Sequence, residues 1–427
     1  MLLSNARYVV TQDDDRRVLE DVDIRTEDGR IEKVGKNLEA DGETVDCSGK
    51  AVLPGLVNAH THAAMTLLRG ISDSKPLQRW LEDDIFPAEE EMGEEDVAAG
   101  TRLASLEMLT SGTTTFNDMY VPGDVVAEVV DDVGIRAVIG HGMMDIEGDT
   151  RETLEKSEEF VSRWSGHDLI KPSVAPHAVY TCSRELLEGS GEQAAEFDAP
   201  LHIHLSETER ENRDCREEHG MSPAEYLDGL GLLNGRTVAA HGVHLSDSDI
   251  RLMAERGAGV VHNPAANLKL GSGVAPVHEL REAGVTVGLG TDGVASNNSL
   301  NLFEEMKLAS LMQKERDPRT LPAQDVLDMA TRDGAELLGL DHEIGSIEEG
   351  KRADLVTVDL SRPEMRPIHG IDGLISNLVF SFDGTVSDVM VDGELLVRDE
   401  TPVSTGLAEA VRDVQERSER ILNAAES

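Results

Sequence analysis

The central part of the chain alternates short apolar runs, rich in β-branched residues, with longer stretches of helical spacing. Strands that alternate with helices in this way are typical of a parallel sheet wrapped by helices. We therefore predict an α/β fold, a (β/α)8 TIM-like barrel over residues 56–345, whose strand ends meet at one catalytic rim. Six runs are predicted strands, each reaching a polar residue at or just beyond its end: residues 137–140, 170–175, 201–204, 237–240, 259–262 and 285–290.

The two ends of the chain have a different pattern, of short strands separated by turns. Residues 1–55 hold three such strands with a turn at Asp28-Gly29, and residues 346–427 hold a hairpin with Asp392-Gly393 at its tip. Each flank is too small to fold alone, so we predict that they combine into one small β-sandwich domain beside the barrel. The stretch Leu407 to Ala425 has helical spacing and is expected to pack on the barrel.

The composition is strongly acidic, with a formal net charge of −44 spread along the 427 residues. Such a field repels nucleic acid and anionic membranes, and it repels itself unless dense counter-ions screen it. This pattern favours a protein from a high-salt cytoplasm. An acidic disordered tail does not explain it, because the acidic residues are not gathered in one block.

Three scattered cysteines, Cys47, Cys182 and Cys215, offer neither a disulfide framework nor a Cys-x-x-Cys metal pair. The N-terminus lacks the features of a signal peptide, and no apolar run approaches the roughly 18 residues that span a bilayer. We expect a protein of the reducing cytoplasm with no membrane partner. Barrels of this size favour a homo-oligomer.

Four segments that end apolar runs carry metal-ligating side chains. Imidazole nitrogens bind a borderline divalent ion well, a carboxylate completes the set, and an open position leaves room for a water that the ion acidifies. A His-x-His pair at a strand end directs both rings to one face. Any one such residue is as easily a satisfied surface group, but four in order predict a catalytic metal centre. The segments are Asn58–His62, His202–His204, Ala240–Gly242 and Gly290–Gly293.

The sequences of these segments resemble motifs of the amidohydrolase superfamily, and with the further motifs below the resemblance covers nearly the whole chain. Val52–His62 is similar to the first-strand signature of that superfamily, and Ile347–Val356 is similar to its C-terminal signature. Within the superfamily, three further segments resemble the deaminases of 5'-methylthioadenosine, S-adenosylhomocysteine and 5'-deoxyadenosine, with the s-triazine hydrolases as near relatives. These segments are His204–Glu209, His262–Pro264 and Thr291–Asn298.

The resemblance implies a role for each site residue. His60, His62, His204 and Asp292 are expected to bind one divalent ion, with Zn²⁺ favoured and Fe²⁺ or Mn²⁺ as alternatives. Asp292 accepts a proton from the attacking water. His241 orients that water and stabilises the tetrahedral centre without binding the metal. Glu207 passes a proton to the purine ring.

The expected nucleoside contacts come from the same resemblance. Trp80 and Glu89 match a loop that packs on the 5' substituent and binds the ribose hydroxyls, and His177 resembles a ribose-contacting histidine. Asn298 is a further candidate contact. Relatives that accept S-adenosylhomocysteine carry an arginine where this chain has His141. Arg151 is the remaining candidate for the carboxylate, so smaller 5' substituents are favoured.

Three alternatives stay open. The same metal centre serves s-triazine chlorohydrolases and aminohydrolases, and a guanine-type deaminase is a third enzymatic possibility. From another class, the barrel could be a catalytically inactive scaffold. Complete metal ligands together with Glu207 argue against a scaffold, which has no physical need for them.

Overall fold

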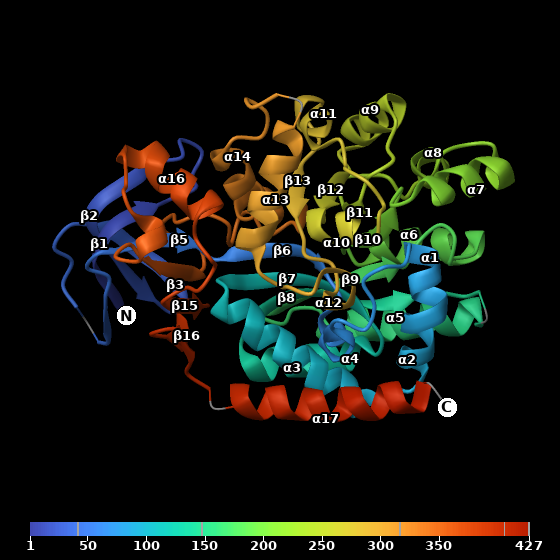
Figure 1. Cartoon of the computed structure of the whole chain (residues 1–427), viewed down its shortest axis with the longest axis horizontal. Coiled ribbons are helices and arrows are strands. Elements are labelled where there is room, and N and C mark those ends of the chain that lie inside the picture. Colours follow the sequence, from blue (N-terminus) through green and yellow to red (C-terminus); the bar gives the residue numbers. More distant parts are fainter. Residues whose placement is uncertain (41, 147, 316, 405, 426–427) are drawn as a thin grey trace.

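The computed structural model describes residues 1–425 apart from residues 41, 147, 316 and 405. Among these residues, eight parallel strands form one sheet in the order β13-β12-β11-β10-β9-β8-β7-β6 (Figure 1). The first and last strands meet where the Asp292 amide donates to the His60 carbonyl, at 3.0 Å, and the sheet nearly closes into a barrel. The strands are β6 (Leu56–Thr61), β7 (Thr113–Tyr120), β8 (Arg136–Met143), β9 (Ile170–Pro176), β10 (Leu201–Leu205), β11 (Thr237–His241), β12 (Gly259–His262) and β13 (Val287–Leu289).

The predicted barrel is confirmed, and the six predicted strands correspond to β8 through β13. Strand β7 lay outside that prediction because much of its buried face is polar. Thr113, Thr115 and Asn117 are all buried, and the Asn117 side chain donates to the Ala59 carbonyl of the neighbouring strand at 2.8 Å. A hydrophobicity pattern does not detect a strand whose side chains face a polar barrel interior.

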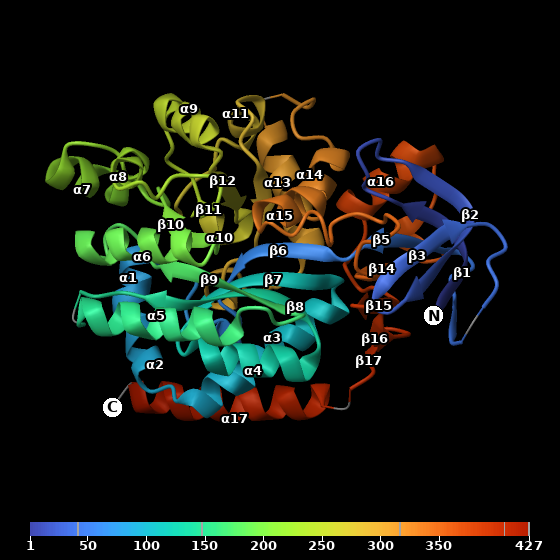
Figure 2. The same cartoon turned by 180° about the vertical axis from the view of Figure 1, so that it is seen from behind.

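Helices lie around the barrel between successive strands (Figures 1 and 2). Helix α4 shows why they form: Val126, Val130 and Val133 bury one face, and Gly134 ends the helix in the left-handed conformation at φ 84°. The elements between β6 and β13 are η1 (Ala63–Leu68), α1 (Leu77–Trp80), η2 (Leu81–Ile85), α2 (Phe86–Glu90), α3 (Glu94–Thr110), α4 (Gly123–Val133), α5 (Thr150–Trp164), α6 (Arg184–Glu196), α7 (Glu209–His219), α8 (Pro223–Gly229), α9 (Asp247–Arg256), α10 (Pro264–Lys269) and α11 (Val277–Glu282).

More helices follow the last barrel strand. Within the described chain, none of the helices is both long and apolar enough to cross a membrane. The remaining helices are α12 (Val294–Asn297), α13 (Leu302–Lys314), α14 (Ala323–Met329), α15 (Arg332–Leu337), η3 (Pro363–Met365), α16 (Gly370–Phe380) and α17 (Leu407–Ala425).

The two chain ends form a second, mixed sheet beside the barrel, at the left of Figure 1. Strand β5 joins them, since it pairs in parallel with β1 and antiparallel with β14. The predicted small domain is thus one hydrogen-bonded path of strands, and its exact boundaries stay a prediction. The strands are β1 (Leu2–Val10), β2 (Val18–Glu27), β3 (Arg30–Gly35), β4 (Thr44–Asp46), β5 (Lys50–Pro54), β14 (Leu355–Asp359), β15 (Asp388–Val391), β16 (Glu394–Arg398) and β17 (Thr401–Pro402).

The sheet and the barrel are joined by buried charge. Arg136, at the start of β8, donates from Nε to Asp354 Oδ2 at 2.8 Å, and both side chains are almost wholly buried. The last helix, α17, crosses back from the sheet to lie along the barrel helices α3 and α2, as both views show. The expectation that this helix packs on the barrel is confirmed.

Candidate metal centre and substrate cavity

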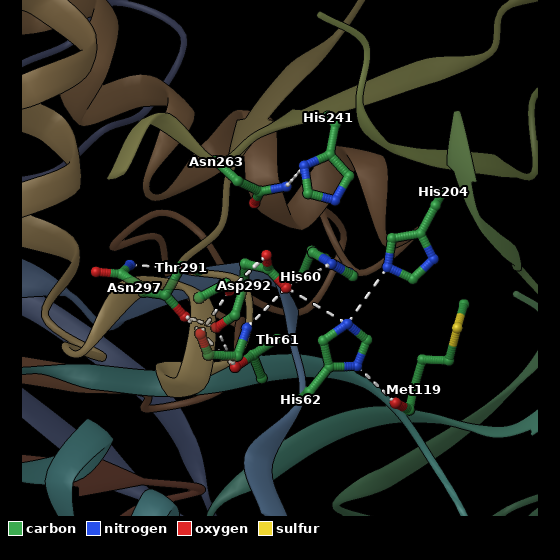
Figure 3. Close-up of polar contacts among 12 residues, drawn as sticks. His60, Thr61, His62, Met119, His204, His241, Asn263, Thr291, Asp292 and Asn297 are labelled. Atoms are coloured by element: carbon green, nitrogen blue, oxygen red, sulfur yellow. Dashed lines mark hydrogen bonds and ion pairs between the residues drawn. The ribbon is translucent and has the colours of Figure 1, made fainter. Parts of the chain in front are cut away.

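Five side chains predicted for the site lie together at one rim of the barrel (Figure 3). His60 and His62 are at the end of β6, His204 is on β10, His241 ends β11, and Asp292 follows β13. Two overlapping sets of ligating atoms lie within 4.8 Å of one another: His60–His62–Asp292 and His60–His204–His241. The parallel strands therefore bring distant parts of the sequence to one point.

Hydrogen bonds on the outer ring nitrogens aim the histidines inward. His62 Nδ1 donates to the Met119 carbonyl at 2.8 Å, and His204 Nδ1 donates to the His177 carbonyl at the same distance. Their Nε2 atoms then carry lone pairs and face each other at 3.3 Å. Fixing a ligand's tautomer from the second ring nitrogen is how proteins orient metal-binding histidines.

His60 completes this arrangement from the buried side. Its Nδ1 lies 2.8 Å from His202 Nε2, while its Nε2 is buried, makes no hydrogen bond among the described residues and lies 3.4 Å from Asp292 Oδ1. Burial lowers the pKa of His60 to about 4, so the ring is neutral near pH 7. A buried, neutral nitrogen without a donor partner fits a divalent ion.

Asp292 faces the three histidines in its ionised form. Burial by itself would raise the pKa of this carboxyl group. The neighbouring His60, His241 and His62 rings have the larger, opposite effect and hold its pKa well below the usual range. Gly293 N donates to Oδ1 and Ser296 Oγ donates to Oδ2, both at 2.7 Å. Asp292 thus places an ionised carboxylate oxygen beside the His60 and His62 nitrogens, a mixed donor group of the kind that binds a divalent ion.

Three residues at or beside the site adopt the left-handed backbone conformation, which residues other than glycine seldom adopt. His241 has φ 74° and Asp292 has φ 60°, and Ser206, beside Glu207, has φ 49°. Such conformations persist only where the surrounding structure imposes them, and they gather at functional sites. Here they occur at or just after the ends of β10, β11 and β13, where the side chains of the site lie.

Glu207 and His241 form a pair of titratable side chains at the same rim. His241 Nε2 lies 3.8 Å from Glu207 Oε2, and its Nδ1 is 2.9 Å from Asn267 Oδ1. Burial raises the pKa of Glu207 and lowers that of His241, but the carboxylates of Glu207 and Asp292 outweigh burial and raise the pKa of His241 overall. The pair can hold and exchange a proton next to the metal donors.

Glu211 supports this pair and was not among the predicted residues. One carboxyl oxygen accepts from the Ser206 amide at 2.9 Å, and the other accepts from the Glu207 amide at 2.8 Å. Burial raises the pKa of Glu211 to about 7. Nothing in the sequence separates Glu211 from the many surface acids around it, because its role depends on how the chain turns after β10.

A cavity of about 470 Å³ opens over the site. The charged side chains in its lining are acidic, and no lysine or arginine lines it within the described chain. One wall is apolar and rich in methionine: Met65, Leu77, Trp80, Leu81, Ile85, Phe86, Met92, Val97, Met119, Val121, Met143 and Met144. Its volume and largely apolar wall suit a small organic ligand.

Trp80, Glu89 and His177 all line this cavity, as does Glu207. Glu89 Oε1 accepts from the Tyr120 hydroxyl at 2.6 Å, and burial raises the pKa of Glu89. Burial and the nearby site histidines lower the pKa of His177 to about 3, so this ring is neutral.

The structure does not bring Arg151, Asn298 or His141 to the cavity. Arg151 lies in the first turn of α5, where its side chain is 87% exposed and pairs with Glu155. Asn298 ends α12 and accepts from Lys269. His141 Nδ1 accepts from the Gly123 amide at 3.3 Å. Each side chain is occupied elsewhere, so none enters the functional proposal below.

A (β/α)8 barrel with four histidines and an aspartate gathered at one rim is typical of one class of protein, the metal-dependent barrel enzymes. Residues 51–396 match the amidohydrolase family, and the chain belongs to this family.

Among its relatives is the 5'-deoxyadenosine deaminase of Methanothermobacter thermautotrophicus, 48% identical over 88% of this chain and 89% of that protein. Two solved structures are also similar to this chain. One is an adenosine deaminase from Xanthomonas campestris with bound zinc, 39% identical with a TM-score of 0.95 over 99% and 98% of the two chains. The other is the atrazine chlorohydrolase of Arthrobacter aurescens complexed with zinc, 29% identical with a TM-score of 0.92 over 98% and 99%.

Proposed function

We propose that this chain is a metal-dependent hydrolytic deaminase that converts 5'-substituted adenosines into the corresponding inosines and ammonia. The observation that carries the proposal is Glu207 facing His241, beside the four metal donors and inside a cavity that Glu89 also lines. One relative, 48% identical to this chain, is a 5'-deoxyadenosine deaminase by its name. The fold alone supports many chemistries, so the proposal depends on these side chains.

His60, His62, His204 and Asp292 are proposed to hold one divalent ion, with Zn²⁺ favoured. The support is the set of inward-facing Nε2 atoms, the free Nε2 of His60, and zinc in two similar structures. When bound, such an ion supplies Lewis acidity that lowers the pKa of a water toward neutrality.

The residues of this chain divide the proton transfers between them. Asp292 accepts a proton from the water that attacks the purine C6 carbon, and His241 stabilises the oxygen of the tetrahedral centre. Glu207, whose pKa is raised by burial, donates a proton to ring nitrogen N1. Asp292 then passes the proton that it took from the water to the exocyclic nitrogen, which leaves as ammonia. The hydroxyl group on C6 gives its remaining proton to Glu207 as the C6 carbonyl forms, so C6 keeps the oxygen. One water is consumed for each ammonia released.

The ribose and the 5' group are bound by the cavity residues Glu89 and Trp80 and their neighbours. Glu89 accepts hydrogen bonds from the two ribose hydroxyls, with Tyr120 holding its carboxyl group in place. Trp80 and the methionines around it bind the 5' substituent. Because 5'-deoxyadenosine and 5'-methylthioadenosine arise as by-products of S-adenosylmethionine chemistry, the enzyme would serve their salvage.

The test is an ammonia-release screen on the zinc-loaded protein in high salt. We expect ammonia from 5'-deoxyadenosine and 5'-methylthioadenosine. Guanine and a chloro-triazine should release neither ammonia nor chloride at comparable rates. Faster turnover of guanine or the triazine would replace the proposal by the corresponding alternative. A protein that binds no divalent ion and turns over none of these compounds would instead be a scaffold.

The setting of the enzyme is proposed from its composition. The charge of −44 favours a high-salt cytoplasm, where counter-ions screen the repulsion between carboxylates. Three buried cysteines without disulfides fit a reducing compartment. A homo-oligomer is the expected assembly for a barrel of this kind.

A further inference from the structure

A short turn between α2 and α3 has one side on the cavity and the other on the C-terminal helix. Residues of α2, of the turn and of the first part of α3 line the cavity, namely Phe86, Glu89, Met92, Gly93 and Val97. On its outer side, α17 packs along both α2 and α3 (Figures 1 and 2). The segment from α2 to the start of α3 therefore contacts both the cavity and α17.

Asp96 is the contact point between the turn and the helix. Only 4% of Asp96 is exposed, yet it is an acid, so it needs donors. Arg417 Nη1 donates to one oxygen at 3.0 Å, and Arg420 Nη2 donates to the other at 2.6 Å. The Gly93 amide adds a third bond at 2.9 Å, which caps α3.

Arg420 also reaches the turn directly. Its Nη1 donates to the Glu91 carbonyl at 3.4 Å, which ties the helix to the backbone just before Met92. Helix α17 also has an apolar contact with the barrel that does not involve these charges, because Ala410, Val414 and Ile421 are buried. The two arginines thus act on the position of the turn more than on the attachment of the helix.

We propose that Arg417 and Arg420 are positioning residues for substrate binding, which act through Asp96 to fix the segment from α2 to the start of α3 that carries Glu89 and Met92 into the cavity. The proposal rests on the proposed function for the identity of the substrate. Neither arginine touches the substrate. A displacement of about 1 Å in a group that binds substrate is costly. Loosening this segment therefore weakens nucleoside binding, while the metal centre stays intact because its side chains come from the barrel strands.

The experiment compares Arg417→Met/Arg420→Met with wild type in the zinc-loaded full chain. A matched control, Arg412→Met/Gln415→Met, changes two exposed residues of the same helix. We expect KM for 5'-deoxyadenosine to rise about tenfold and kcat to change by less than about twofold, with the zinc content unchanged. The control should match wild type, and Arg417→Lys/Arg420→Lys should recover much of the lost affinity.

Asp96→Asn provides a second test that keeps both arginines and leaves a capping oxygen for the Gly93 amide. It should raise KM in the same direction. The proposal is overturned if KM stays at the wild-type value in both variants, or if kcat, zinc content and melting temperature all fall together with it, which would indicate a general structural role.

Hydrogen exchange over residues 86–97 separates this proposal from the proposed function. If wild type releases no ammonia from any adenosine, the proposed function fails. The arginine proposal is then judged by exchange alone. Faster exchange in the double variant than in the control supports it, and equal exchange overturns it.

Discussion

Replacing Glu207 by glutamine removes the proposed proton donor and keeps nearly the same side-chain shape and contacts. The side chain is 4% exposed, so a substitution that kept less volume would open a cavity, whereas glutamine has nearly the same shape. The amide oxygen can still accept from Ser272 Oγ, which lies 3.3 Å from Glu207 Oε1. We therefore expect a stability change below about 1 kcal/mol and unchanged zinc content.

The expected effect on turnover is large. A positioned acid contributes about 10²–10⁴-fold to a proton-transfer step, which corresponds to about 3–5 kcal/mol of activation free energy. Glu207 is the only acid in the Ser206–Thr208 turn that faces the site, and it lies 3.8 Å from His241. Glutamine cannot donate a proton to N1, so kcat should fall by that factor.

The assay is ammonia release from 5'-deoxyadenosine at saturating substrate, with zinc content and thermal melts measured on the same samples. Glu209→Gln is the matched control, because Glu209 is two residues away and exposed. It should turn over at the wild-type rate. If Glu207→Gln keeps more than about a tenth of the wild-type kcat, Glu207 is not the proton donor and the reasoning is refuted.

Four further outcomes are expected. His62→Ala should lose both bound zinc, measured by elemental analysis, and turnover; retention of a full zinc equivalent would contradict the ligand set. Glu211→Gln should destabilise the protein by about 1–3 kcal/mol in denaturant melts and lower kcat, since an amide can accept from only one of the two backbone amides that Glu211 satisfies; an unchanged melt would contradict this. S-adenosylhomocysteine should show a kcat/KM at least about tenfold below that of 5'-deoxyadenosine, because no lysine or arginine of the described chain lines the cavity to pair with its carboxylate; equal values would refute this. The melting temperature should rise between low and molar salt as the net charge of −44 is screened, and a flat response would remove the high-salt interpretation.

The sequence by itself determined the barrel and predicted which side chains gather at its rim. Buried strands of a parallel sheet are apolar along their whole length, so β8 through β13 are visible in the hydrophobic pattern. His60, His62, His204 and Asp292 could be predicted to meet because each lies within or just after the last residues of a strand, and parallel strands end at one rim. The polar strand β7 escaped the same reasoning, since Thr115 and Asn117 face the barrel interior.

Only the tertiary structure decided which residues outside the strand ends take part. Arg151 is chemically suited to a carboxylate, but its place on α5 turns it to solvent. Glu211 and Asp96 look like two of many acids in an acidic chain, yet folding buries both. Glu211 accepts from backbone amides of the turn just before its own helix, and Asp96 accepts from Arg417 on the distant C-terminal helix. Strand ends are fixed by local periodicity, whereas the partners of a helix or turn residue depend on long-range packing that no local pattern encodes.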